Sequence, residues 1–230
     1  MKYQRPLLIT VFVLLILSIS GWLIYDGVNK WRTTFVAGAP PINLENAIPP
    51  QTVDLGKMRP PALRFNDPVL FGGVTSSASV ILFGDYRCDD CRRLEQAVKQ
   101  VLPKYKGAVR YIWRDLPQSD RKYDFDAAVF AYCAGLQGKF WETHNALMLM
   151  GSNIDDITSS GLTQSLKLDV NTLNSCRLDQ QTTAIIQQDA EQAGGDGVTS
   201  TPIMFIGTEA VKGYLPAETI DKKIQLYLGS

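Results

Sequence analysis

Two cysteines three residues apart, Cys88 and Cys91, are the side chains of this chain best placed to do chemistry. They follow a short apolar run at residues 80–83 and stand where a helical pattern begins. The free backbone N–H groups and the dipole of a helix N-terminus let a sulfur ionise below the usual thiol pKa. A thiolate attacks disulfides, and a second cysteine one turn on can resolve the mixed disulfide. The pattern therefore predicts thiol–disulfide exchange.

Two other uses of the pair compete with this interpretation, namely half of a zinc site and a purely structural disulfide. Zinc would need two more ligands, and the remaining candidates Cys133, Cys176 and His144 form no second Cys-x-x-Cys motif. A bridge across so short a loop removes little chain entropy and so stabilises little. Redox use is favoured, and we expect neither a metal nor an organic cofactor.

Length and composition narrow the class of protein. The chain has 230 residues and no net charge, which fits one medium domain with extra segments and gives no electrostatic reason to expect nucleic-acid binding. Four cysteines are too few for a small disulfide-framework protein. They suit an enzyme with one active pair and one other pair.

The N-terminal segment predicts a membrane anchor. Residues 7–25 form an uncharged apolar run close to the ~20 residues that a spanning helix needs, after a basic stub at residues 1–6. The alternative is a cleaved signal peptide with a weak small-residue site at residues 18–20, although the apolar run continues beyond it. We expect an uncleaved single-pass anchor, with the stub in the cytoplasm and the body outside it, where disulfides persist.

Residues 26–66 are predicted to be a proline-rich tether. Three proline doublets interrupt this segment, and no amphipathic period joins them. Such a chain is semi-extended at ~3 Å per residue. The alternative is that parts of it, such as residues 43–44 and 53–55, pack along the folded body.

The folded body is predicted to begin near residue 67. We predict a central strand at residues 79–84, buried on both faces, and a second strand at residues 109–116. The helix between them carries Glu95 and Lys99 as an exposed pair one turn apart. Helical spacing then recurs at residues 125–136, 140–150, 162–168, 170–178 and 182–193. A hairpin of strands 202–206 and 210–214 and a helix at 217–228 complete the pattern. The domains predicted are therefore a strand–helix–strand unit and a hairpin with a helix (67–118 and 196–230), separated by a helical insertion (119–195).

Three motifs, in this order, resemble those of the thioredoxin-fold disulfide oxidoreductases of the bacterial envelope, the disulfide-bond-protein A type. They are FGDYRCDDC at residues 83–91, CAGLQGKFW at 133–141 with His144 following, and GVTSTP at 197–202. The resemblance covers residues 67–228. It implies an α/β thioredoxin fold with an inserted helical domain of the bacterial envelope. Together with the anchor predicted at residues 7–25, this places the domain in the periplasm or outside the cell, tethered to the inner membrane.

The resemblance also implies roles for individual residues. Cys88 would be the exposed nucleophile and Cys91 the buried resolving partner, while Thr201 and Pro202 would share a cis peptide bond facing Cys88. An X-Pro bond needs only ~0.5–1 kcal/mol to become cis, which suits a sharp turn beside the sulfurs. The alternative for Pro202 is an ordinary proline at the start of a strand.

The residues around the cysteines differ from the best-known members, which carry proline and histidine between them. Asp89 and Asp90 oppose ionisation of Cys88, whereas Arg87 and its neighbours Arg92 and Arg93 favour it. A destabilised thiolate makes a weaker oxidant, so the pair is expected to act as a reductase or isomerase rather than as a strong oxidase. The two aspartates could equally serve to stabilise the first turn of the helix.

Three further side chains receive predicted roles. Asp85 is a candidate proton acceptor for Cys91, although a loop carboxylate that caps the helix is the favoured interpretation. His144 is expected to be a packing residue. Cys133 and Cys176 are expected to form a structural disulfide that stabilises the helical block by ~3–4 kcal/mol, with two buried free thiols as the alternative.

These observations lead to one main functional hypothesis and one rival. The first is a monomeric, membrane-anchored thiol–disulfide oxidoreductase that exchanges disulfides with extracytoplasmic proteins and with a redox partner protein in the membrane. The rival is a thioredoxin-like module without catalysis that binds a client, or a Cu(I) chaperone that uses the two cysteines as a soft dithiolate.

Overall fold

A computed structural model describes the part of the chain that carries the cysteine motif. It covers residues 58–64, 67–117, 122–154 and 161–229. All of these belong to one compact unit, Ile48–Ser230. The predicted stub, the predicted anchor and residues 26–57 of the predicted tether lie outside the described residues. Within the described ranges, no helix has the length and apolar character needed to cross a membrane.

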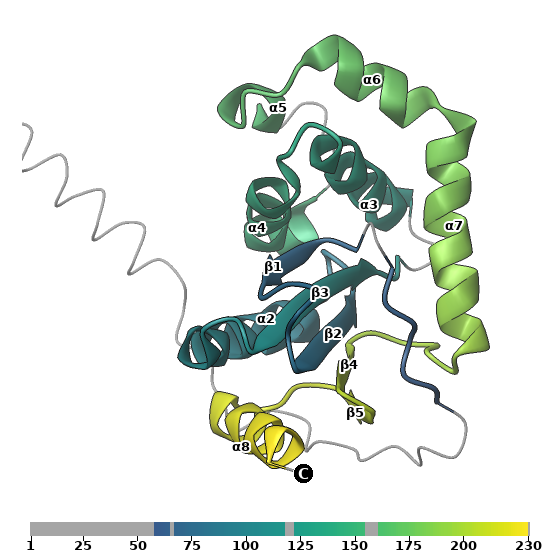
Figure 1. Ribbon diagram of the computed structural model, residues 1–230. Helices are drawn as coiled ribbons and strands as arrows, with labels where there is room; N and C mark the ends of the chain where they lie inside the picture. Colours follow the sequence, from purple (N-terminus) through teal and green to yellow (C-terminus); the bar gives the residue numbers. More distant parts are fainter. Residues whose placement is uncertain (1–57, 65–66, 118–121, 155–160, 230) are drawn as a thin grey trace, which may run out of the picture. The chain divides into compact units, whose positions relative to one another are not determined.

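A five-stranded sheet forms the centre of the unit, with the strand order β1-β3-β2-β4-β5 (Figure 1). The strands are β1 (Val69–Phe71), β2 (Ala78–Gly84), β3 (Val109–Asp115), β4 (Ile203–Ile206) and β5 (Glu209–Lys212). The β2 and β3 strands are parallel, as the crossover through a helix requires, and the other pairs are antiparallel. The strand predictions for β2, β3 and the β4–β5 hairpin are confirmed. The strand β1, which has only three residues, was not expected from the sequence.

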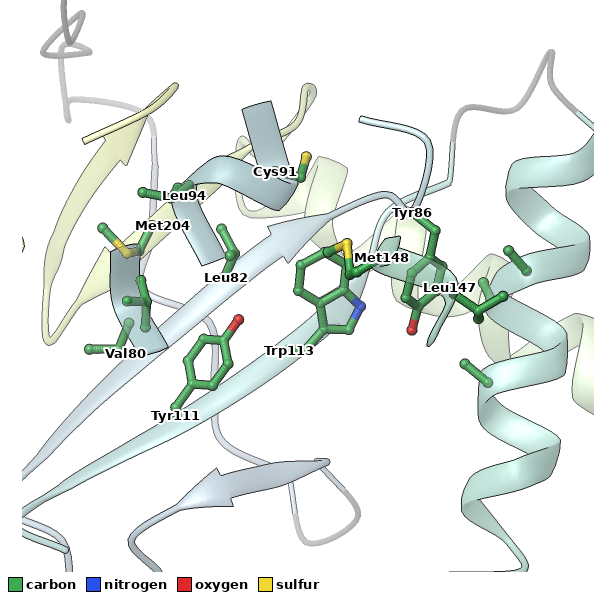
Figure 2. Packing of buried hydrophobic residues seen from close by; sticks show 14 of the residues in the cluster. Val80, Leu82, Tyr86, Cys91, Leu94, Tyr111, Trp113, Leu147, Met148 and Met204 are labelled. Atoms are coloured by element: carbon green, nitrogen blue, oxygen red, sulfur yellow. The ribbon is translucent and has the colours of Figure 1, made fainter. Parts of the chain in front are cut away.

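The central strand β2 is apolar on both of its faces because helices cover both. Val80 and Leu82 point into a core shared with α2 (Asp89–Val101) and α8 (Ala217–Leu228) (Figure 2). Ile81 and Phe83 point into a second core on the opposite face, to which Ala193 of α7 (Gln180–Gly195) contributes. This arrangement explains the unbroken apolar run in the sequence, since an alternating pattern is needed only where one face meets water.

The helix α2 begins at the cysteine pair and is amphipathic, as predicted. It ends at Val101 and continues as a 3₁₀ turn, η2 (Leu102–Tyr105), which accommodates the proline at 103. One detail of the prediction is wrong: Glu95 is not exposed but only 2% accessible, although it does pair with Lys99. A carboxylate buried on the core face of this helix needs further partners, and these lie in the helical insertion.

Among the described residues of the helical insertion there are five α-helices, two of which have the bounds that the sequence predicted. They are α3 (Lys122–Gly135), α4 (Phe140–Met150), α5 (Leu162–Ser165), α6 (Val170–Leu178) and α7, with a 3₁₀ turn η3 (Gly151–Asn153) after α4. The helix expected at 162–168 stops at Ser165, because Lys167 adopts a left-handed backbone conformation with φ of 56°. The insertion also packs on the sheet through α7.

A disulfide between Cys133 of α3 and Cys176 of α6 joins two helices of the insertion. The two Cα atoms lie 5.8 Å apart, within the range of an ordinary disulfide, and the bridge closes a sequence separation of 43 residues. Cys133 is fully buried, so its sulfur also belongs to the core.

Replacing both Cys133 and Cys176 by alanine is expected to lower the free energy of unfolding by about 3 kcal/mol, because the loop entropy of the unfolded chain is restored. Urea unfolding of the variant and of the parent, with the Cys88–Cys91 pair oxidised in both, measures this difference. An unchanged midpoint would mean that the bridge does not constrain the chain.

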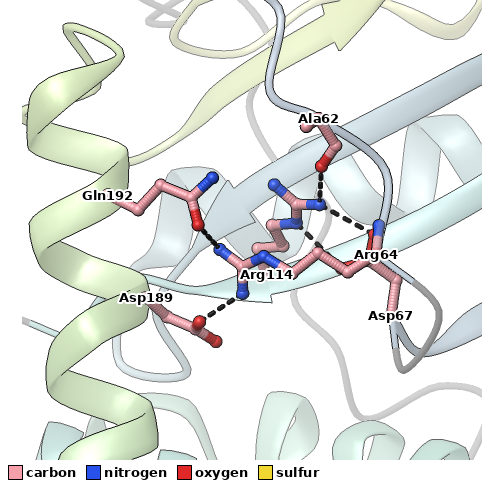
Figure 3. Close-up of polar contacts among 6 residues, drawn as sticks. All are labelled: Ala62, Arg64, Asp67, Arg114, Asp189 and Gln192. Carbon is pink, nitrogen blue, oxygen red and sulfur yellow. Dashed lines mark hydrogen bonds and ion pairs between the residues drawn. The ribbon is translucent and has the colours of Figure 1, made fainter.

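The residues before β1 form an N-terminal strap, defined here as residues 58–64, that lies against the folded body (Figure 3). The backbone N–H of Arg59 donates to the carbonyl of Asp196, and the Arg64 guanidinium contacts Asp189 and Gln192 of α7. The predicted tether therefore does not extend through residues 58–64. Proline doublets exclude regular structure, but they do not prevent side-chain and backbone contacts with a neighbouring surface.

Candidate active site

The cysteine pair lies at the N-terminus of α2, where the sequence placed it. Cys88 is the N-cap residue, with extended backbone angles, and its sulfur accepts a hydrogen bond from the backbone N–H of Cys91 at 3.0 Å. The two residues form a disulfide, with Cα atoms 5.2 Å apart. Cys88 is partly exposed, whereas Cys91 is fully buried. Cys88 is therefore the more accessible residue of the pair, and on reduction its sulfur would stand where helix N–H groups stabilise a thiolate.

The last residue of β2, just before the cysteine loop, packs directly against the indole ring of Trp113, and only glycine fits there. A Cβ atom on Gly84 would lie 2.1 Å from the ring of Trp113 on β3, a distance that no side chain can adopt. Trp113 is fully buried, and its Nε1–H donates to Asp115 at 2.7 Å. Tyr86, two residues before Cys88, packs its ring against that of Trp113, with the ring centroids 5.6 Å apart (Figure 2).

Thr201 and Pro202 share a cis peptide bond immediately before β4. In the β2–β4 ladder Ile203 pairs with Phe83, so Pro202 comes level with the last residue of β2. Cys88 follows β2 at that same end of the sheet. The structure therefore places the Thr201-Pro202 segment and the cysteine loop at the same end of the neighbouring strands β2 and β4.

The charged residues between and around the cysteines pair with one another. Asp89 accepts from Arg92 at 2.8 Å, and Asp90 pairs with Arg93, each one turn along α2. The Nε atom of Arg87 lies 3.3 Å from a carboxylate oxygen of Asp124, and the same guanidinium donates to the carbonyl of Ile154 at 2.7 Å. The arginines expected to favour a thiolate are thus already engaged with carboxylates.

Asp85 holds the turn that leads into α2. Its carboxylate accepts the backbone N–H of Arg87 at 2.7 Å, and its carbonyl accepts that of Cys88 at 3.2 Å. The side chain is only 3% exposed. These contacts match the structural interpretation favoured from the sequence, in which a loop carboxylate orders the helix start.

His144 has polar partners that the sequence did not reveal. Its Nε2 lies 2.6 Å from a carboxylate oxygen of Glu95, and its Nδ1 lies 3.2 Å from the hydroxyl of Tyr86. The ring is fully buried, with the ring of Trp113 centred 4.6 Å away. His144 is therefore a packing residue, as predicted, and also a hydrogen-bonding one. The one sequence signal was a lone histidine one turn beyond a Phe-Trp pair.

Burial shifts the acid–base behaviour of this cluster. Desolvation lowers the pKa of His144 despite the nearby carboxylate of Glu95. Burial acts to raise the pKa of Glu95, but its hydrogen bond to His144 and the charges of His144 and Lys99 lower it overall. Burial of the carboxyl group also raises the pKa of Asp115 to about 7, in spite of its hydrogen bonds with Trp113 and Tyr86.

Known proteins that resemble this chain in sequence or in structure have the thioredoxin fold. The family model described as Thioredoxin matches residues 66–225. A thioredoxin-like oxidoreductase from Silicibacter pomeroyi DSS-3 superposes with a TM-score of 0.64 at 25% identity, over 73% of this chain and 95% of that one. The thiol-disulfide exchange protein alpha-DsbA2 from Wolbachia pipientis gives 0.62 at 22% identity, over 70% and 87% of the two chains.

The chain also matches part of several much longer proteins that are named as sodium/proton antiporters. The Na(+)/H(+) antiporter NhaA 1 of Salinispora arenicola is 29% identical over 147 residues, which are 64% of this chain and 22% of that protein. The chain thus spans about a fifth of the length of the first curated relatives it matches. The family model covers well over half of the chain, and the matched residues include the cysteine motif, all five strands of the sheet and the helical insertion. This chain therefore belongs to the thioredoxin family.

Proposed function

We propose that this protein is a thiol–disulfide oxidoreductase that exchanges disulfides with extracytoplasmic proteins through Cys88 and Cys91. The observation that carries the proposal is the unequal exposure of the two cysteine residues at one helix N-terminus, with Cys88 partly exposed and Cys91 fully buried. A purely structural bridge would not need one sulfur open to solvent beside a helix end.

The exchange has two balanced steps. In the reducing direction, the Cys88 thiolate attacks a client disulfide, which forms a Cys88–client bond and releases one client thiolate. The Cys91 sulfur, after losing its proton, then attacks Cys88 and releases the second client thiolate, leaving the Cys88–Cys91 disulfide. A redox partner protein restores the dithiol by supplying two electrons and two protons. Asp85 remains a candidate for the proton of Cys91, and Thr201-Pro202 for orienting the client backbone.

The setting that we propose is the outer side of a bacterial inner membrane. The apolar run at residues 7–25 would anchor the protein there, and an oxidising compartment would preserve the Cys133–Cys176 bridge. The curated relatives named as antiporters are much longer than this chain, so no transport activity is carried over to it.

We further propose that the pair acts as a reductase or isomerase rather than as a strong oxidant. Replacing Asp89 and Asp90 together by asparagine would leave Arg92 and Arg93 without their carboxylate partners near Cys88. The thiolate should then be favoured, and the reduction potential of the pair should rise by about 20–30 mV. Equilibration with glutathione at pH 7 measures the shift, with the Arg92→Gln, Arg93→Gln variant expected to move in the opposite direction. A potential already near that of strong oxidants in the parent protein would contradict the proposed direction.

The exchange itself is tested by turnover of a protein disulfide substrate, with the full-length chain in detergent. The parent protein should reduce insulin in the presence of a thiol donor, and Cys88→Ser should lose this activity. The matched control is the Cys133→Ala, Cys176→Ala variant, which keeps the Cys88–Cys91 pair and should retain turnover. If the parent protein shows no turnover while it still holds a client, the rival client-binding module would replace this proposal.

A further inference from the structure

A short turn of the helical insertion lies against the cysteine motif. It consists of η3 and the residue that follows it, residues 151–154, and we call it the rim turn. Gly151 and Ile154 at its two ends are buried, and the side chain of Ile154 belongs to the hydrophobic core. Ser152 and Asn153 between them are exposed. The rim turn therefore presents two polar residues at the surface from buried supports on either side.

Arg87, which directly precedes Cys88, holds the end of the rim turn. Its guanidinium donates to the carbonyl of Ile154 at 2.7 Å, while its Nε lies 3.3 Å from the buried carboxylate of Asp124 at the start of α3. A guanidinium can serve both groups at once because its N–H donors form a rigid planar fork. The residue next to Cys88 thus fixes where the rim turn ends.

Arg92, which directly follows Cys91, lies against the beginning of the rim turn. Its backbone N–H donates to the carbonyl of Cys88 at 3.1 Å, and its Nη1 lies 3.1 Å from the place that a Cβ atom on Gly151 would take. Gly151 has a φ of 53°, a backbone conformation that glycine adopts without strain. Arginines on both flanks of the cysteine pair therefore contact the two ends of the rim turn.

This arrangement places Ser152 and Asn153 where a polypeptide that reaches Cys88 has free backbone groups. An extended chain advances ~3.3–3.6 Å per residue, so the second and third residues from a client cysteine lie ~7–10 Å along the surface. A serine hydroxyl and an asparagine amide can each donate and accept, which suits the N–H and C=O groups of an extended segment whatever its side chains are. A small disulfide has no such segment to offer.

We propose that Ser152 and Asn153 bind the backbone of a client polypeptide beside Cys88, and that Arg87 is the positioning residue that holds the rim turn for this contact. The contact adds one from the helical insertion to the one proposed for Thr201-Pro202, and it favours polypeptide disulfides over small ones. The inference rests on the proposed function and names its class of substrate as extended polypeptide segments.

The first test compares the second-order rate constants with which the fully reduced, full-length chain reacts with insulin and with 2-hydroxyethyl disulfide. The Ser152→Ala, Asn153→Ala variant should react about fivefold more slowly with insulin, the effect of losing about one ordinary hydrogen bond, and at an unchanged rate with the small disulfide. The matched control is Asn171→Ala, Ser175→Ala, which alters two exposed residues of the same types on α6 (Figure 1). It should leave both rate constants unchanged.

Arg87→Lys tests the positioning role, because lysine keeps the positive charge next to Cys88 but has no planar fork to hold Ile154 and Asp124 together. The rate constant for insulin should fall about threefold, while the rate constant for the small disulfide and the alkylation rate of Cys88 should stay the same. An equal loss with both disulfides, or no loss with either, would overturn this role. The same outcomes in the Ser152→Ala, Asn153→Ala variant would overturn the proposed contact.

A second measurement needs no turnover. In the Cys91→Ser variant, Cys88 would be joined chemically to a cysteine-containing peptide or, for comparison, to 2-mercaptoethanol. The backbone amide signals of Ser152 and Asn153 in nuclear magnetic resonance spectra should differ between the two adducts, and those of Asn171 and Ser175 should not. Identical Ser152 and Asn153 signals would overturn the inference. A failure of the proposed function appears instead as a parent protein without client turnover, and the two adducts can still be compared.

Discussion

Replacing Cys91 by serine is expected to turn the protein from a catalyst into a trap for its clients. Cys88, which is partly exposed, can still attack a client disulfide, but the sulfur that would release the captured client is gone. Turnover should fall on the order of 10³-fold or more, as when a residue of an interdependent catalytic set is removed. Mixed disulfides should accumulate and be visible on gels run without reductant.

The matched control for this experiment is the Cys88→Ser, Cys91→Ser double variant, which should hold no client. Cys88→Ser alone should capture little, because the remaining sulfur of Cys91 is fully buried. Equal trapping by Cys88→Ser and Cys91→Ser would contradict the assignment of Cys88 as the attacking sulfur.

Replacing Asp67 by alanine is expected to destabilise the folded unit by about 3–5 kcal/mol, the usual cost of leaving one member of a buried ion pair without its partner. The Asp67 carboxylate accepts two hydrogen bonds from Arg114, at 2.7 and 3.0 Å, and a third from the backbone N–H of Arg64 at 2.8 Å. The side chains of Asp67 and Arg114 are 4% and 3% exposed. Urea unfolding of the oxidised protein would measure the loss.

The control for Asp67→Ala is the double variant Asp67→Leu, Arg114→Met, which removes both charges together. It should recover much of the lost stability, since the cost of the single change comes mainly from the stranded guanidinium. The carbonyl of Ala62 would still lose its hydrogen bond from Arg114, so full recovery is not expected. If Asp67→Ala were as stable as the parent protein, the Asp67–Arg114 ion pair would not contribute to the stability of the contact between the strap and β3.

The elements that carry the cysteines were predictable because local patterns determine them. The apolar run of β2, the start of α2 at Cys88 and the bounds of α4, α6 and α8 all follow from periodicity and end signals. The bond between Cys133 and Cys176 was expected from their placement on two insertion helices, but only coordinates could show that their Cα atoms come within 5.8 Å.

The buried polar partners were not predictable, because contacts distant in sequence create them. Glu95 and Lys99 have the spacing of an exposed helix pair, and nothing in α2 indicates that a histidine 49 residues away will meet that carboxylate. The strap was missed for a similar reason, since Arg64 finds its partner on α7, 125 residues further along the chain. A three-residue strand such as β1 is too short to produce a periodic signal.

The sulfur of Cys88 is expected to attack clients while the buried sulfur of Cys91 resolves the mixed disulfide, and competitive alkylation measures this order most directly. The fully reduced protein would be treated with limiting iodoacetamide at pH 6.5, and the modified cysteine would be identified by mass spectrometry. We predict that Cys88 reacts at least about a hundredfold faster than Cys91, because it is the more exposed residue and caps the helix. Equal rates, or faster modification of Cys91, would contradict the account.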